Sequence, residues 1–265
     1  MKLTNDTNRK RVVVLTRDGF YSRLFVREFL ATAGLDVVGI VYSTAYMRRG
    51  ATPIEDALRF IARVGLFYAM YQAYIAWLLP WLIGLKRELN CPVLKSNNVN
   101  SDSTVTWLNE LKPDFLMAFH FNQKMLQSVI DIPNRAALNF HPSYLPAWRG
   151  VDPVLFALQE EGSLFGGSIH RVTAQIDGGD VLLREKLGNE HVAGLIKTNE
   201  ALFTLGGRMA AEVLSDFDAF DGRRLRQADL DAGLGHEACY DGWYNVGQVG
   251  LVGLWKALWA KPRKV

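Results

Sequence analysis

Short apolar runs alternate with stretches of helical periodicity along most of the chain. Residues 11–16, RVVVLT, form a β-branched run after a polar lead and predict a buried strand. Across 20–33 apolar residues recur at helical spacing, and Gly34 follows where helices often end. Residues 35–42, LDVVGIVY, predict a second strand. This strand–helix–strand order with short connections predicts parallel pairing through a right-handed crossover.

The same alternation continues as far as residue 214. We expect helical structure at 52–89, 101–111, 124–130, 153–160 and 198–214, and strands at 91–94, 113–119, 136–140, 166–172 and 181–186. Beyond it, 215–235 is polar, charged and loop-like, and 240–259 is rich in glycine and aromatic residues. The pattern predicts an α/β class fold, a Rossmann-like open, mostly parallel twisted sheet with flanking helices. We expect a catalytic domain over 1–214 and a short C-terminal extension over 215–265.

One apolar stretch, 64–85, contains no charged residue and is long enough to span a bilayer. Pro80 and Gly84 interrupt it, Gln72 lies inside it, and predicted strands of one domain flank it. We therefore expect a helix packed in the core or in a subunit interface, which leaves a homodimer open. The alternative is peripheral membrane contact through 64–85 and the amphipathic tail 249–265, because aromatic apolar faces with basic flanks suit a membrane surface.

Composition narrows the function classes. The chain has 265 residues, of which 49% are hydrophobic and 22% charged, enough for a sizeable core and unlike a disordered chain. The net charge is only +3 and the sequence contains no recognisable nucleic-acid-binding motif, so we expect no nucleic-acid partner. The two cysteines lack metal-ligand spacing, so we expect no metal. The polar start resembles no signal peptide, and we expect a cytoplasmic protein.

Candidate chemistry follows the predicted strand 136–140. Asn139 and His141 are two apart, so on a strand end they point to the same side, where parallel sheets place their ligand crevices. Asp177 precedes Gly178-Gly179, and the glycines allow a sharp turn that presents its carboxylate. An amide, an imidazole and a carboxylate suit acyl transfer to an amine, in which Asn139 and His141 stabilise an oxyanion and Asp177 assists proton removal.

The string around these residues resembles the folate-dependent formyltransferases. It reads NFHPSYLP over 139–146, then WRG over 148–150, with His170 seven residues before Asp177-Gly178-Gly179. The family includes glycinamide ribonucleotide, methionyl-tRNA and sugar N-formyltransferases. The resemblance implies that Asn139, His141 and Asp177 are the catalytic trio of a transferase for one-carbon transfer, and that 10-formyltetrahydrofolate is the formyl donor.

The resemblance also implies further binding residues. In the family the pterin lies against segments matching 118–124 and 173–177. The amino-acid sequence of 118–124 in this chain departs from the usual apolar pattern of that segment. The expected cofactor-binding residues are Phe119, Phe121, Asn122, Gln123, Thr173 and Gln175. The expected substrate-binding residues are Ser143, Arg149 and Gly150.

Differences between this sequence and the family pattern bear on which amine accepts the formyl group. The loop 16–22, TRDGFYS, does not match the phosphate loop of the ribonucleotide enzymes, and the tail is too short for the further domain of the transfer-RNA enzymes. We expect a small-molecule amine, with nucleotide-linked amino sugars or an apolar, membrane-borne amine as open choices. Two rival functions also stay open: a 10-formyltetrahydrofolate hydrolase, and a non-catalytic folate- or nucleotide-binding module associated with a membrane.

Overall fold

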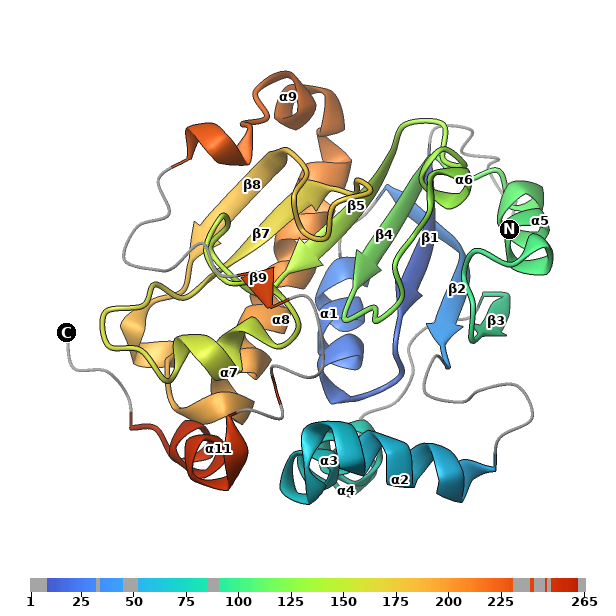
Figure 1. Cartoon of the computed structure of the whole chain (residues 1–265). Coiled ribbons are helices and arrows are strands. Elements are labelled where there is room, and N and C mark those ends of the chain that lie inside the picture. Colours follow the sequence, from blue (N-terminus) through green and yellow to red (C-terminus); the bar gives the residue numbers. More distant parts are fainter. Residues whose placement is uncertain are drawn as a thin grey trace.

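A seven-stranded sheet in the order β3-β2-β1-β4-β5-β7-β8 forms the centre of the molecule (Figure 1). The computed structural model describes residues 9–31, 34–44, 52–84, 91–230, 239–240, 246 and 249–261. The parallel strands are β1 (Lys10–Thr16), β2 (Leu35–Ser43), β3 (Val93–Ser96), β4 (Phe115–Phe119) and β5 (Ala136–His141). The strands β7 (Gly166–Arg171) and β8 (Val181–Lys186) pair antiparallel at one edge. The predicted Rossmann-like, mostly parallel sheet is thereby confirmed.

Helices cover both faces of this sheet. On one face, α1 (Phe20–Leu30) and α8 (Gly194–Ser215) pack against alternate β1 residues such as Val12 and Val14. On the other face, α5 (Asp102–Glu110) and α6 (Gln127–Ile130) pack against Val13 and Leu15. Successive strand residues point to opposite faces, so the continuous apolar run of β1 supplies both cores.

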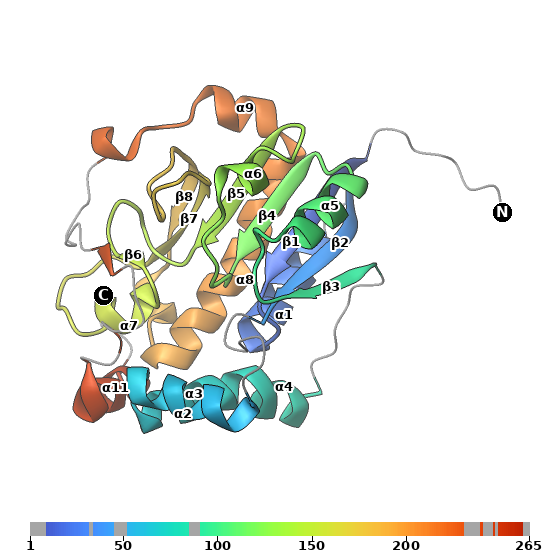
Figure 2. The same cartoon turned by 45° about the vertical axis from the view of Figure 1, so that its right-hand side comes forward.

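The segment between β2 and β3 forms a row of helices beyond the carboxyl ends of the parallel strands (Figure 2). It contains α2 (Pro53–Val64), α3 (Leu66–Ala73), the π-helical turn η1 (Tyr74–Leu78) and α4 (Leu79–Leu82). The expected helical region is broken at Gly65, whose φ of 83° suits glycine. None of the helices that the structure describes has both the length and the apolar character needed to cross a membrane.

The chain after β8 contains more helix than its composition predicts. The turn η2 (Asn189–His191) leads into α8, and α9 (Phe217–Gly222) follows it. The expectation of a loop over 215–235 is wrong for α9, because Phe217 and Phe220 lie three apart and are both buried. The turn η3 (Gln227–Asp229) comes next, and α11 (Gly250–Leu258) packs beside α3 and α8.

A helix and a small two-stranded sheet complete the described structure. The helix α7 (Pro153–Ala157) follows the strand β6 (Arg149–Gly150), which pairs with β9 (Cys239–Tyr240). Residues 231–238 and most of 241–248 lie outside the described residues. The division of the chain at residue 214 therefore stays a prediction.

Candidate active site

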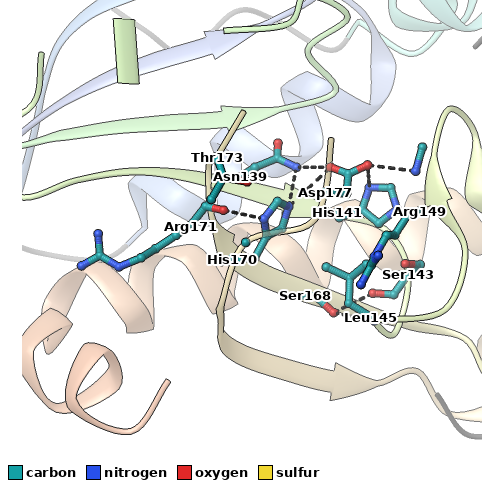
Figure 3. Close-up of polar contacts among 12 residues, drawn as sticks. Asn139, His141, Ser143, Leu145, Arg149, Ser168, His170, Arg171, Thr173 and Asp177 are labelled. Atoms are coloured by element: carbon teal, nitrogen blue, oxygen red, sulfur yellow. Dashed lines mark hydrogen bonds and ion pairs between the residues drawn. The ribbon is translucent and has the colours of Figure 1, made fainter. Parts of the chain in front are cut away.

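The strand β5 places Asn139 and His141 together at its carboxyl end. β5 pairs with β4 on one side and with β7 on the other, so both side chains are fixed within the sheet. His141 is 4% exposed, and Asn139 is partly buried. The side-chain direction that strand periodicity predicts is the one the structure shows (Figure 3).

Asp177 reaches the same point from the turn between β7 and β8. Its φ of 48° lies in the left-handed region, and a Cβ on Gly179 would lie 1.9 Å from the carbonyl oxygen of Arg171. The close approach requires glycine at residue 179. Gln227 holds the turn, because its Nε2 donates to the carbonyl oxygens of Asp177 at 2.7 Å and Gly179 at 2.8 Å.

The three predicted catalytic side chains meet (Figure 3). Asn139 Nδ2 donates to Asp177 Oδ1 at 3.3 Å, and His141 Nδ1 lies 3.4 Å from Asp177 Oδ2. The backbone N–H of Gly150 donates to the same Oδ2 at 2.9 Å. The carboxylate is therefore held by an amide, an imidazole and a backbone N–H.

The ionisation of the pair depends on competing effects. Burial is the largest influence on His141 and lowers its pKa, while the charge of Asp177 acts in the opposite direction. Burial raises the pKa of Asp177, but its electrostatic interactions with the imidazoles of His141 and His170 and the hydrogen bond from the Gly150 N–H outweigh burial and hold this pKa below its usual value. These directions favour a neutral imidazole beside a charged carboxylate.

The tautomer of neutral His141 follows from its other partner. Nε2 lies 2.8 Å from the carbonyl oxygen of Trp148, which only accepts, so Nε2 carries the proton. Nδ1 is then the basic atom, and it faces Asp177. A proton taken up at Nδ1 lies directly beside the carboxylate, which stabilises the imidazolium that forms.

His170 belongs to the same cluster, although the residue chemistry did not single it out. Its Nδ1 donates to the carbonyl oxygen of Arg171 at 2.9 Å, so its Nε2 accepts from Asn139 Nδ2 at 3.0 Å. The two N–H bonds of the Asn139 amide thus point at His170 and Asp177. The only sequence signal was its position in the motif, seven residues before Asp177.

A cavity of about 400 Å³ opens in front of the cluster. Asn139, His141, Gly150 and Asp177 line it, as do the expected donor-binding residues Phe121, Asn122, Gln123, Thr173 and Gln175. Its size lies within the range of small-molecule sites. No group of three or more His, Cys, Asp or Glu side chains in the described part of the chain is placed to hold a metal ion.

Three expected binding residues lie elsewhere. The side chain of Phe119 is fully buried and stacks on Phe25, with ring centroids 3.7 Å apart. Ser143 Oγ donates to the carbonyl oxygen of Ala147 at 2.7 Å, and Arg149 Nε donates to Gln227 Oε1 at 2.9 Å. These contacts hold the core and the loops around the site.

The opposite wall of the cavity comes from residues that the sequence did not indicate. The buried Arg17, in the loop after β1, donates to Gln72 Oε1 of α3 at 3.2 Å, and Gln72 Nε2 donates to the Tyr68 hydroxyl at 2.7 Å. The Tyr68 hydroxyl in turn donates to Asp152. Burial raises the pKa of Asp152 to about 6, against the lowering effects of Tyr68 and Arg17.

Comparison with known proteins finds a family over the part of the chain that contains this cluster. Residues 82–193 match the family model described as "Formyl transferase", and they contain all three of the predicted catalytic residues. The methionyl-tRNA formyltransferase of Anaplasma marginale is 28% identical over 143 residues, 54% of this chain and 47% of that protein. That of Ehrlichia ruminantium is 33% identical over 111 residues, 42% of this chain and 37% of that protein.

Over residues 82–193 this chain is similar to the formyl transferases. It spans about half, or less, of the length of these curated relatives. Solved structures share the fold: glycinamide ribonucleotide transformylase 1 from Symbiobacterium toebii has a TM-score of 0.56 at 17% identity, covering 84% of this chain and 93% of that one. A sugar N-formyltransferase from Shewanella sp FDAARGOS_354 has a TM-score of 0.53 at 15% identity, covering 94% and 88%.

Proposed function

We propose that this chain is a cytoplasmic enzyme that transfers the formyl group of 10-formyltetrahydrofolate to an amine of a small molecule. The observation that carries the proposal is the junction of Asn139, His141 and Asp177 at the mouth of one cavity. Within the family model that matches 82–193, this junction supplies the groups that acyl transfer needs. The catalytic domain is proposed to be 1–214, and 215–265 an extension.

His141 is the proposed base. An amine at neutral pH carries a proton that it must lose before it attacks, and the basic Nδ1 of His141 faces the carboxylate of Asp177. Once the proton is on Nδ1, the imidazolium places positive charge beside the oxyanion that forms at the formyl carbon. As the old carbon–nitrogen bond breaks, this proton passes to the departing nitrogen of the donor, and the attacking nitrogen, which became cationic on attack, loses its surplus proton to the His141–Asp177 pair.

Asn139 is the proposed oxyanion donor. Both of its N–H bonds already have acceptors, so to donate to an oxyanion its amide must give up its 3.3 Å contact with Asp177. That contact is the weaker of the two by distance, 3.3 Å against 3.0 Å to His170. His170 keeps the amide nitrogen directed at the site during this exchange.

The roles of the trio are tested by single substitutions. We expect Asn139→Ala, His141→Asn and Asp177→Asn each to lower the rate of formyl transfer about a hundredfold or more. The measurement is turnover of 10-formyltetrahydrofolate with a panel of amines that starts with nucleotide-linked amino sugars. His191→Asn is the matched control, because His191 is exposed on η2. Unchanged turnover in all three variants would instead support a non-catalytic binding module.

The hydrolase alternative needs a separate measurement. Incubation of the protein with 10-formyltetrahydrofolate and no amine is expected to release formate slowly compared with transfer. Rapid stoichiometric release of formate, lost in Asp177→Asn, would show that water is the acceptor and would contradict the transferase.

A further inference from the structure

The outer side of α3, η1 and α4 is uniformly apolar. Every exposed residue from 66 to 84 is apolar: Leu66, Phe67, Met70, Trp77, Leu78, Trp81, Leu82, Ile83 and Gly84. The inner side of the same helices is buried or lines the cavity, through Tyr71 and Ile75 among others. The helices therefore separate the cavity from an apolar outer surface.

The helix α11 extends this surface, although it lies far away in the sequence. Both views place α11 beside α3 (Figures 1 and 2). A narrow groove between the two helices is lined by Phe67 and Leu251. The outward residues of α11 include Leu251, Val252 and Trp255. We call the exposed apolar residues of 66–84 and 251–259 the apolar face.

Tryptophan is concentrated on the apolar face. Trp77, Trp81, Trp255 and Trp259 are 76%, 75%, 61% and 69% exposed. Leaving such large apolar side chains in water is unfavourable, and a contiguous group of them marks an interaction surface. Tryptophan is also the residue that prefers the boundary between headgroups and acyl chains in a membrane.

The charges around the apolar face have one dominant sign. Arg59, Lys256 and Lys261 are exposed on or beside its helices. Of the two acidic residues of α2, Asp56 is 8% exposed, whereas Glu55 is exposed and its carboxylate accepts from the Thr52 N–H in a capping box, so the exposed cations outnumber this exposed carboxylate. The exposed surface is thus apolar with cationic margins, which complements an anionic lipid surface.

We propose that the apolar face docks on a lipid surface that carries anionic headgroups. A protein partner would be expected to meet a polar rim with hydrogen-bonding groups, whereas the indole N–H groups of Trp77 and Trp81 are the only polar groups on the exposed side chains of 66–84. The inference goes beyond the proposed formyl transfer and does not depend on it. Docking would bring the wall that contains Tyr71 and Ile75, and the cavity behind it, close to the lipid surface.

Vesicle flotation of the full chain tests the proposal. With vesicles of phosphatidylglycerol and phosphatidylcholine we expect the protein to float, and with phosphatidylcholine alone to float at least tenfold less. Trp77→Ser combined with Trp81→Ser, and Trp255→Ser combined with Trp259→Ser, should each reduce flotation at least tenfold. These side chains are exposed, so the variants keep the core, which near-ultraviolet circular dichroism checks.

Matched controls come from apolar residues away from the face. Leu126 and Leu225 are each 53% exposed, and Leu126→Ser combined with Leu225→Ser should float like the parent protein. Equal flotation of all variants would overturn the proposal. A second result would also overturn it: a parent protein that sediments as a stable dimer and does not bind vesicles, and whose tryptophan variants sediment as monomers. A second copy of the chain would then cover the apolar face.

Discussion

His170 fixes the direction of the Asn139 amide, and this contact is a consequence of two strands lying side by side. Asn139 and His170 are register partners across β5 and β7. His170→Leu removes the acceptor at Nε2, and we expect kcat to fall by about a hundredfold because the amide loses its orientation. His170→Gln, which can accept through its Oε1, should recover part of the loss. Steady-state kinetics of the two variants check this, and equal activities would contradict it.

Asp152 destabilises the folded protein when it is ionised. Burial raises its pKa to about 6 from 3.8, so the folded state binds a proton more tightly than the unfolded one. Stability from this group is therefore present at low pH and is lost as pH rises from about 4 to 6. Asp152→Asn should raise the free energy of unfolding by roughly 1–3 kcal/mol at about pH 8, after allowance for its partial contact with solvent.

The same variant provides its own control. Near pH 4 the Asp152 carboxyl of the folded protein is already neutral, so the two proteins should differ little in urea unfolding there. Asn also tolerates the φ of 52° at this residue, which keeps the backbone comparison fair. A gain in stability of the same size at both pH values would show that ionisation is not its cause.

At the scale of the elements, the first turn of α2 depends on a capping box. The Thr52 hydroxyl accepts from the Glu55 N–H at 3.3 Å, and the Glu55 carboxylate accepts from the Thr52 N–H at 2.8 Å. Thr52→Ala should lower the free energy of unfolding by about 1 kcal/mol, measured by urea titration. Thr106→Ala, at an exposed position inside α5, should leave it unchanged or slightly raised. Equal losses would contradict a capping role.

Close packing of α8 on α1 depends on Gly207. A Cβ built there would lie 2.4 Å from the carbonyl oxygen of Phe25, a backbone atom that cannot move aside. Gly207→Ala should therefore lower the free energy of unfolding by about 1–3 kcal/mol, despite the better helix propensity of alanine. Gly222→Ala is the control, because nothing lies within 4 Å of its added Cβ. A melting temperature of Gly207→Ala equal to that of the control would refute the close contact.

The elements also show what the sequence could and could not predict. The strands around the site were predictable because β-branched and apolar runs leave few alternatives, and their parallel order followed from the connections. Asn139 and His141 were predictable because strand alternation fixes their direction. The wall formed by Arg17 and Gln72 was not, since these residues are 55 apart in sequence and meet only through tertiary packing. The break between helices at Gly65 was also not predicted, because the residues around it are apolar and carry no polar signal of a helix end.

Across the whole molecule, the cavity and the apolar face share one set of helices. Residues of α3 and η1 contribute Tyr68, Tyr71 and Ile75 to the inner wall and Phe67 and Trp77 to the outer surface. The sequence prediction left a packed helix and a surface helix as alternatives for 64–85. The structure shows one buried side and one exposed side, so the segment combines both features.

This arrangement makes lipid docking depend on charge as well as on tryptophan. Each cation close to an anionic membrane contributes about 1 kcal/mol, so neutralising Arg59, Lys256 and Lys261 together should weaken vesicle binding by roughly a hundredfold. The triple variant Arg59→Gln, Lys256→Gln and Lys261→Gln, titrated with phosphatidylglycerol vesicles, measures this. Exposed charges are screened by salt, so binding of the parent protein should fall between about 0.05 M and 0.5 M salt, and binding of the triple variant should fall less.

Neutralising Arg208, Arg223 and Lys112, which lie away from the apolar face, should change neither the vesicle affinity nor its dependence on salt. A salt response that is the same in the parent and the triple variant would show that these cations do not face the lipid.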